Sequence, residues 1–342
     1  MNTLLIGKSL NHNAEPSAIR ALRAMGLSTE FICYKTSLPE QLKWLKLPAS
    51  ISYLAREIIA DTSLKKYNEE IIAEATNFNP DLILIFKGEG IGEQTLKSIS
   101  NSIGIKIALW SPDDPQFFKS RALRIPRNVD YAFTYASNAI SMYKEEGIGN
   151  VFRLVFELDY EIHRKLETNK IYGITFIGTL GKRRSSIVRS LKKNRINVHV
   201  FGRGEFGIPV EFMYRPVYLD EYVRVLNQSC LTLNINQNTY CGQNMRTFKA
   251  TASGIQLLTD CADDIKEFFT EEEVTYCIDL RSLTDILKEF FHYGEKPHQT
   301  VDKDYIKHRY DHTYSVSMRA ILVKRSCLMN KTRRARGIRC TT

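Results

Sequence analysis

The segment from Asn244 to Asp260, NMRTFKATASGIQLLTD, contains side chains suited to binding an anion. Asn244 and Arg246 fall where a helix is expected to begin, and Lys249 follows one turn later. A guanidinium at that point can hold a diphosphate through two parallel hydrogen bonds. The alternative is an internal salt bridge, for which Asp260 is a plausible partner of Arg246. We therefore treat this segment as a candidate phosphate site.

Two other loops in the same half of the chain are also suited to phosphate. In FIGTLGKRR, Gly178 and Thr179 follow an expected strand, and Arg183 and Arg184 bring cations to the next helix. A basic first turn opposes the helix dipole unless an anion binds there. The alternative is a solvated basic helix. In VFGRGEFG, Gly202 belongs to a fragment of a dinucleotide motif, but the full GxGxxG spacing is absent.

The first half of the chain offers carboxylates instead. Glu89 lies in the loop of LIFKGEGI, and Asp113 and Asp114 lie between two prolines in LWSPDDP. A carboxylate held at the end of a strand is suited to act as a general base on a hydroxyl. The alternative is that these acids cap helices or make turns, and we expect such a structural role for one of the two aspartates.

The elements that position these residues alternate between strand-like and helical patterns. Two such series, joined near residues 159–172, predict an α/β fold with two Rossmann-like domains. The predicted organisation is residues 1–160, residues 173–325 and a basic tail at residues 326–342. A helical stretch near the end, HTYSVSMRAILVKRS, is expected to pack back on the first domain.

The composition is that of a globular protein: 43% of the 342 residues are hydrophobic and 25% are charged. No apolar run reaches the roughly 18 to 20 residues needed to span a bilayer. The segment MNTLLIGKSL leads directly into a strand, so no signal peptide is expected. The seven cysteines form no CxxC, which favours reduced thiols in a cytoplasmic protein without a structural metal. Among the histidines, His163 is expected at the surface.

The net charge of +10 is concentrated near the end of the chain. Residues 319–342 contain eight basic side chains and no acidic one. This favours a solvated tail, with a patch for anionic lipid at the inner face of the membrane as the alternative. Nucleic acid is not expected as a partner, because no recognised nucleic-acid motif accompanies the charge.

Together these segments resemble the CgeB-like (spore maturation protein B-like) glycosyltransferases with a family 1 type C-terminal domain. The matching segments occur in order through most of the chain: NPDLILIFKGEGI, IALWSPDDP, VDYAFTYASNAISMYKEEGI, ITFIGTLGKRR, VHVFGRG, NMRTFKATASGIQLLTD and EVTYCIDLRSL. The resemblance implies a GT-B fold, in which two Rossmann-like domains face each other across a cleft. It places a nucleotide-activated sugar in the C-terminal domain and the acceptor in the N-terminal domain.

The resemblance also assigns roles to residues. Arg183 and Arg246 would stabilise the diphosphate leaving group, and Gly178 and Thr179 would approach the phosphates. Tyr218, in the loop at residues 216–219, would lie near the base. Such enzymes usually need no bound metal, because cations and helix dipoles stabilise the leaving group. The resemblance therefore implies a donor substrate but no cofactor and no metal.

On the acceptor side, Asp113 or else Glu89 would lie near the reacting hydroxyl. The chain departs from the family at Lys249, because the family pattern Arg-x-Phe-Glu ends in a carboxylate that would accept hydrogen bonds from the ribose. An ammonium donates hydrogen bonds and accepts none. Lys249 would instead contact a phosphate or a different donor, or it would mark a protein that has lost turnover.

These observations predict a hexosyltransferase-like enzyme that moves a sugar from a nucleotide diphosphate sugar to a hydroxyl of a glycan, lipid or protein. Two alternatives stay open. One is a non-catalytic protein that binds nucleotide sugars on the same scaffold, as the change at Lys249 would allow. The other is a nucleotide-sugar epimerase, for which the sequence shows no specific feature.

Overall fold

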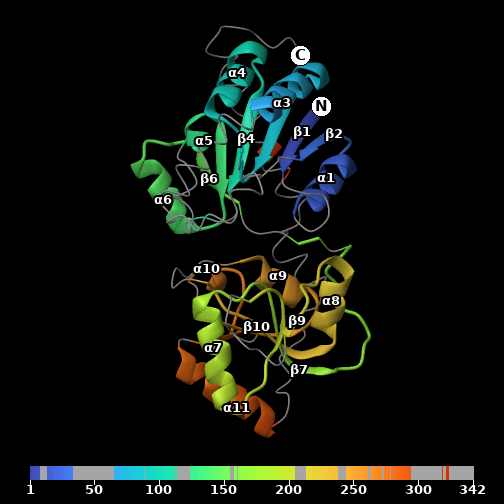
Figure 1. The fold of residues 1–342 in the computed structure, drawn as a ribbon, viewed down its shortest axis with the longest axis vertical. Helices are drawn as coiled ribbons and strands as arrows, with labels where there is room; N and C mark the ends of the chain where they lie inside the picture. The colour runs from blue at the N-terminus through green and yellow to red at the C-terminus, as the bar shows by residue number, and fades with distance from the viewer. Residues whose placement is uncertain are drawn as a thin grey trace. The chain divides into compact units, whose positions relative to one another are not determined.

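The computed structural model divides the chain into two compact units, Met1–Val155 with Tyr314–Thr342, and Phe156–Thr313 (Figure 1). Each unit is described by itself. The structure describes residues 1–7, 14–33, 65–88, 90–111, 114, 124–154, 158–159, 161–204, 213–237, 244–260, 263–271, 273–277, 279–293, 318 and 321–322.

The first unit contains a parallel sheet of six strands with the order β2-β1-β3-β4-β5-β6. Its elements are β1 (Asn2–Gly7), α1 (Glu15–Ala24), β2 (Ser28–Cys33), α3 (Lys65–Phe78), β3 (Leu82–Phe86), α4 (Glu93–Ile103), β4 (Lys106–Ser111), α5 (Arg124–Arg127), β5 (Tyr131–Thr134), α6 (Ser137–Glu145) and β6 (Val151–Arg153). The central strand β3 is apolar and buried throughout, and the middle of β4 is as well, because helices cover both faces of the sheet.

Alternate residues of each central strand enter different cores. Leu4 packs in a cluster with residues of α3 and α4, whereas Leu5 packs with residues of α1 on the other face. Met318 and Ile321, at 0% and 1% exposure, belong to the same cluster as Leu5. The prediction that a segment near the end of the chain packs on the first domain is therefore confirmed.

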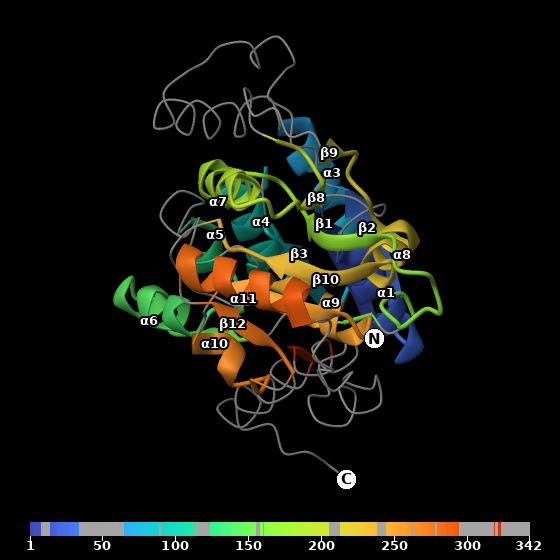
Figure 2. The ribbon, with the colours of Figure 1, turned by 90° about the horizontal axis from the view of Figure 1, so that it is seen from below.

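The second unit contains another parallel six-stranded sheet, with the order β12-β11-β10-β7-β8-β9. Its elements are β7 (Tyr172–Ile177), α7 (Lys182–Lys193), β8 (His199–Phe201), β9 (Met213–Tyr214), α8 (Leu219–Asn227), β10 (Ser229–Asn234), α9 (Met245–Ala252), β11 (Gln256–Asp260), α10 (Asp263–Lys266), β12 (Thr275–Cys277) and α11 (Leu280–Tyr293). α7 and α11 pack on one face and α8 on the other, and β8 lies between α7 and α8 in Figure 2.

Two parallel sheets with helices on their faces confirm the predicted α/β fold class. Because all strands of the second sheet are parallel, their carboxyl ends meet at one edge. Ile177, Phe201, Asn234 and Asp260 end four of these strands. Ligands of open parallel sheets bind at this edge, where loops lead into helix N-termini. The candidate phosphate residues of the second unit lie in the loops and first helical turns that follow these strands.

Candidate functional site

Asn244 fixes the start of α9. Its Oδ1 accepts a hydrogen bond from the backbone N–H of Arg246 at 2.9 Å, so Asn244 is the N-cap of the helix. Its Nδ2 donates to the side-chain oxygens of Asn234 and Asn236, both at 2.9 Å. Asn234 is fully buried and in turn donates to Thr247. The amide network therefore fixes the first turn of α9 against the end of β10.

Arg246 extends from this first turn toward the end of β7. Its Nε–H donates to the carbonyl of Ile177 at 2.9 Å, and its guanidinium carbon lies 5.8 Å from the centroid of the Phe176 ring. Among the residues that the structure describes, its two terminal nitrogens have neither a hydrogen-bond acceptor nor an ion-pair partner. Burial lowers the pKa of Arg246 below its ordinary value. The hydrogen bond from Nε thus orients the side chain of Arg246, and its two terminal nitrogens stay available as donors.

Gly178 provides the space that Arg246 occupies. Its φ is +148°, a backbone conformation that other residues rarely adopt. A Cβ atom on Gly178 would lie 2.7 Å from Nη2 of Arg246. Gly202, which begins the loop after β8, is also constrained, because a Cβ atom there would lie 2.0 Å from the carbonyl oxygen of Gly178. The two glycines let the loops after β7 and β8 approach each other closely.

Asp260 pairs with Arg183 and not with Arg246. Nη1 of Arg183 donates to Oδ2 of Asp260 and to the carbonyl of Asn236, both at 2.6 Å. Asp260 is 8% exposed and also accepts hydrogen bonds from the backbone and side chain of Asn236. The partner suggested for Arg246 by the sequence is therefore engaged by the start of α7.

Arg184 points into the protein. It is 4% exposed, its Nε–H donates to the carbonyl of Ile235 at 2.7 Å, and its Nη1 donates to the carbonyl of Thr179 at 2.9 Å. Burial, and secondly the charge of Arg246, lower the pKa of Arg184 to about 9. These contacts join the start of α7 to the end of β10. Thr179 contributes a backbone acceptor to this arrangement.

Lys249 lies one turn after Arg246, in a half-buried position. Its Nζ is 5.4 Å from the centroid of the Tyr222 ring on α8. Burial, and then Arg246, lower the pKa of Lys249 to about 8. The same ring contacts His163, at 6.2 Å between centroids. His163 is 7% exposed, so its prediction as a surface residue is wrong: it packs beneath α8 with Nδ1 3.1 Å from the carbonyl of Asp159.

Tyr218 is the N-cap residue of α8 and is 42% exposed. Leu219, which follows it, is 44% exposed and has a φ of +48°, which is uncommon for a residue with a branched side chain. No hydrogen bond of the Asn244 network reaches this pair of residues in the described part of the chain. Tyr218 is therefore a partly exposed aromatic residue at the start of α8.

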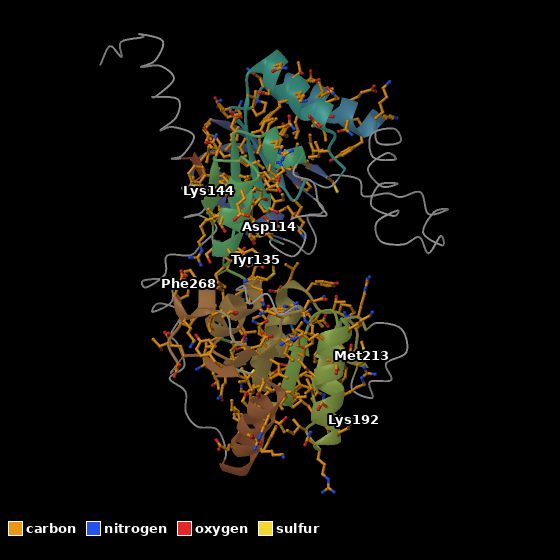
Figure 3. The ribbon with its side chains drawn as sticks, turned by 90° about the vertical axis from the view of Figure 1, so that its left-hand side faces the viewer. Asp114, Tyr135, Lys144, Lys192, Met213 and Phe268 are labelled. Carbon is orange, nitrogen blue, oxygen red and sulfur yellow. The ribbon has the colours of Figure 1, made fainter. Side chains whose placement is uncertain are left out.

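In the first unit, Glu89 and Asp113 lie outside the described residues. Asp114, labelled in Figure 3, is 3% exposed and accepts a hydrogen bond from the hydroxyl of Tyr143 on α6 at 2.8 Å. Burial, and then Asp114, raise the pKa of Tyr143. Asp114 thus has a structural role, a buried hydrogen bond to α6, whereas the helix cap or turn expected for one of the two aspartates stays a prediction.

The structure brings most of the predicted donor-side residues to one edge of the second sheet: Gly178, Thr179, Arg183, Arg184, Gly202, Asn244, Arg246 and Lys249. The basic tail after Leu322 lies outside the described residues. In the described ranges, no helix is long and apolar enough to cross a membrane. Within the same ranges, His, Cys, Asp and Glu side chains do not gather in a group of three that could hold a metal.

Residues 183–323 match the family described as glycosyl transferase-like. The chain is 24% identical over 219 residues to spore protein CgeB of Bacillus subtilis, a match that covers 57% of this chain and 68% of that protein. The matched family segment contains Arg183, Arg246 and Lys249, whereas Gly178 and Thr179 of the same site precede it.

Solved structures show the same fold over nearly the whole chain. Sucrose-phosphate synthase from Thermosynechococcus elongatus superposes with a TM-score of 0.66 at 10% identity, covering 96% of this chain and all of that one. Anabaena Alr3699/HepE in complex with UDP-glucose superposes with a TM-score of 0.65 at 9% identity and the same coverage. These structures have the GT-B fold. The chain therefore has the GT-B fold, and it is similar in sequence to spore protein CgeB and, over residues 183–323, to the glycosyl transferase-like family.

Proposed function

We propose that this protein transfers a sugar from a nucleotide diphosphate sugar to a hydroxyl of a glycan, lipid or protein, and that the second unit binds the donor. The observation that carries the proposal is the state of Arg246. Its Nε is engaged by Ile177, while its terminal nitrogens have no acceptor among the described residues. A guanidinium held in this way presents two parallel donors, the geometry that a phosphate group accepts.

The surroundings of Arg246 favour an anion at this point. The backbone N–H groups in the first turn of α9 and the partial positive charge of the helix N-terminus attract a phosphate. Gly178 keeps side-chain atoms away from the guanidinium. Solved relatives of the same fold include Anabaena Alr3699/HepE in complex with UDP and in complex with UDP-glucose. A nucleotide diphosphate is therefore the ligand that we assign to this edge of the sheet.

In the proposed reaction, the bond between the anomeric carbon and the diphosphate oxygen breaks while the acceptor oxygen bonds to the anomeric carbon. Arg246 stabilises the negative charge that develops on the leaving diphosphate. Arg183 adds a second cation whose charge is shared with Asp260. On the acceptor side, Asp113 takes the proton of the hydroxyl, with Glu89 as the second candidate base.

Two further assignments complete the donor site. Tyr218 offers an exposed ring on which the base can stack. Thr179 and Gly202 shape the loops beside the phosphates, with Thr179 contributing its backbone and Gly202 its lack of a side chain. Arg184 is assigned to holding these loops together and not to contacting the donor, because it is 4% exposed and its Nε and Nη1 donate to backbone carbonyls.

The experiment that tests the proposal measures thermal unfolding of the protein with a panel of nucleoside diphosphates and their sugars. A ligand at about a hundred times its dissociation constant adds about 2.7 kcal/mol to the stability of the folded state. We expect one nucleotide to raise the unfolding temperature, and Arg246→Ala to abolish that rise. Arg189→Ala, an exposed position on α7, is the matched control and should keep it. A flat panel with a folded protein would overturn the donor assignment.

A second candidate function follows from Lys249, which stands where the family pattern has a carboxylate. The protein would then bind a nucleotide sugar without transferring it. Stabilisation by a nucleotide sugar, with neither transfer to acceptor-rich extracts nor hydrolysis, would favour this function. Release of the nucleoside diphosphate in the presence of an acceptor would exclude it.

The basic tail supports a finer proposal, a contact with anionic lipid beside a lipid-linked acceptor. Eight positive charges between residues 319 and 342, with no acidic residue, suit such a surface. Removal of residues 324–342 should then reduce binding to liposomes that contain anionic lipid. Unchanged binding would contradict the proposal.

A further inference from the structure

Lys249 and Arg246 lie on the same face of α9. They are three residues apart, which places their β-carbons roughly 5–6 Å from each other in a helix. The charge of Arg246 reaches Lys249, since Arg246 is the second cause, after burial, of the lowered pKa of Lys249. Two cations one turn apart at the beginning of a helix repel each other unless an anion lies between them.

The groups around Lys249 do not neutralise it. From α8, the ring of Tyr222 lies beneath the ammonium, and burial raises the pKa of its hydroxyl to about 12, so it stays neutral. From the segment before β7, His163 has a pKa lowered to about 3 and is neutral as well. Asp159 is the nearby carboxylate: its charge raises the pKa of Lys249, but less than burial and Arg246 lower it, and its Oδ1 accepts from the backbone N–H of Glu161.

The ammonium of Lys249 is consequently left without a partner of opposite charge. Among the described residues it makes no hydrogen bond and no ion pair. A half-buried charge in this state is costly, and a lysine responds by giving up its proton more readily than in water. A pKa near 8 means that the unliganded protein contains Lys249 in both protonation states at mildly alkaline pH.

We propose that Lys249 is the second cation of the anion site formed by Arg246, and that it takes up a proton from solution when a diphosphate binds under alkaline conditions. This inference rests on the proposed donor site and adds a residue that makes the binding of the donor depend on pH. Arg246 is charged at every relevant pH and provides binding that does not depend on protonation.

The sign of the effect follows from the two protonation states. A bound diphosphate stabilises the ammonium and raises the pKa of Lys249 in the complex. Below pH 7 the lysine is protonated with or without ligand, and binding takes up no proton at this site. Between pH 8 and the higher pKa of the complex, binding must protonate the amine. Affinity therefore falls as the pH rises, by about tenfold between pH 7 and pH 9.

Calorimetric titration with uridine diphosphate at pH 7.0 and pH 9.0 tests this directly. In two buffers with different ionisation enthalpies, the wild-type protein should take up close to one more proton at pH 9.0 than Lys249→Arg. Between pH 7.0 and pH 9.0, the dissociation constant of the wild-type protein for uridine diphosphate should rise about tenfold more than that of Lys249→Arg, because the introduced arginine stays charged. Because the ligand is the same, any titration of the nucleotide itself cancels in the comparison. Equal proton uptake in the two folded proteins would overturn the inference while leaving the donor site intact.

A second measurement does not depend on which nucleotide the protein binds. Pyridoxal 5′-phosphate carries a phosphate and an aldehyde. Its aldehyde condenses with a neutral amine with loss of water, and borohydride then reduces the imine. Pyridoxal lacks the phosphate and, because it closes to an internal hemiacetal, labels every amine more slowly. Peptide mapping at pH 8 should therefore show a larger preference for pyridoxal 5′-phosphate over pyridoxal at Lys249 than at the exposed Lys193. Arg246→Ala should remove this difference.

The two measurements separate the possible failures. If no nucleoside diphosphate binds but the phosphate-dependent labelling of Lys249 is found, the donor assignment fails and the two-cation anion site stands. If the preference for the phosphate-bearing reagent is no larger at Lys249 than at Lys193, the inference is wrong whatever the nucleotide panel shows. Thermal unfolding of each variant provides the check that it is folded.

Discussion

Arg183 donates from Nη1 to Oδ2 of Asp260 at 2.6 Å, and this ion pair joins the start of α7 to the end of β11. Asp260 lies at the same sheet edge as Arg246. It also accepts hydrogen bonds from the backbone N–H and from the side-chain amide of Asn236. With Asp260 committed to Arg183, Arg246 has no carboxylate partner in the described part of the chain. The pairing of one arginine is thus what leaves the other available for a ligand.

Asp260→Ala should destabilise the second unit. The change leaves the backbone N–H of the buried Asn236 without its acceptor and the guanidinium of Arg183 without its carboxylate. Removing the partner of a buried donor costs about 1–3 kcal/mol, and a partly exposed ion pair adds little beyond this. Denaturant unfolding monitored for the second unit measures the loss.

The matched control for this substitution is Asp285→Ala on α11. Asp285 also faces an arginine, Arg281, but at 4.0 Å and with both side chains mostly exposed. Such a surface pair contributes about 0–1 kcal/mol. Equal effects of the two substitutions would show that Asp260 does not organise the sheet edge.

Gly202→Ala should disrupt the donor site strongly, although it adds only one methyl group. The added methyl group would lie 2.0 Å from the backbone carbonyl oxygen of Gly178, and backbone atoms cannot rotate away as a side chain can. We expect a lower unfolding temperature together with weakened nucleotide binding. Gly173→Ala in β7 is the control, because its methyl group would meet only the Phe291 ring at 3.5 Å. If Gly202→Ala is as stable as Gly173→Ala, the loops after β7 and β8 are not packed as described.

His163 should make the second unit sensitive to acid. Burial lowers its pKa in the folded protein to about 3, against 6.5 in the unfolded chain. The unfolded state therefore binds more protons below pH 6.5, and stability is lost as the pH falls through that value. The contribution lost is about 1 kcal/mol at pH 5.5 and about 3 kcal/mol at pH 4.5.

The comparison for this prediction is between His163→Gln and His199→Gln, measured as the free energy of unfolding from pH 7 to pH 4.5. His163→Gln should flatten the pH dependence. Burial lowers the pKa of His199 as well, but this side chain is more exposed than that of His163, so His199→Gln should change the pH dependence less. A profile that is the same in all three proteins would mean that His163 is accessible to protons in the folded state.

The fold of the second unit was accessible from the sequence because its signals are local. The segments YGITFIGTLG and KRRSSIVRSLKKN predict the strand and helix that the structure contains as β7 and α7. The start of α9 was predictable for the same reason, since Asn244 is a strong N-cap residue next to a helical pattern. Parallel strands then bring these loops to one edge without any knowledge of distances.

The partners of the charged residues were not accessible in this way. Arg183 and Arg246 are both plausible partners of Asp260 in the sequence, and only the register of β10 and β11 decides between them. The burial of His163 depends on its packing against Tyr222 on α8, 59 positions later in the printed sequence, and no local pattern indicates it. Long-range pairing, and not local propensity, therefore determined where the sequence interpretation differed from the structure.

Substitutions of the two adjacent aspartates in LWSPDDP should have different effects, one on the stability of the protein and the other on the rate of sugar transfer. Tyr143 donates to Asp114, which is 3% exposed, so Asp114→Asn should lower the free energy of unfolding by about 1–3 kcal/mol. Tyr143→Phe should do the same, and the effects of the two substitutions should not add, because they remove one shared hydrogen bond.

Asp113→Asn, by contrast, should keep the unfolding temperature and lower the rate of sugar transfer at least a hundredfold, as expected for a general base. Donor binding should not change in Asp113→Asn, because the donor is assigned to the other unit. If Asp113→Asn transfers sugar at the wild-type rate, Glu89 becomes the base to test, and a loss of rate in Glu89→Gln with an unchanged unfolding temperature would identify it.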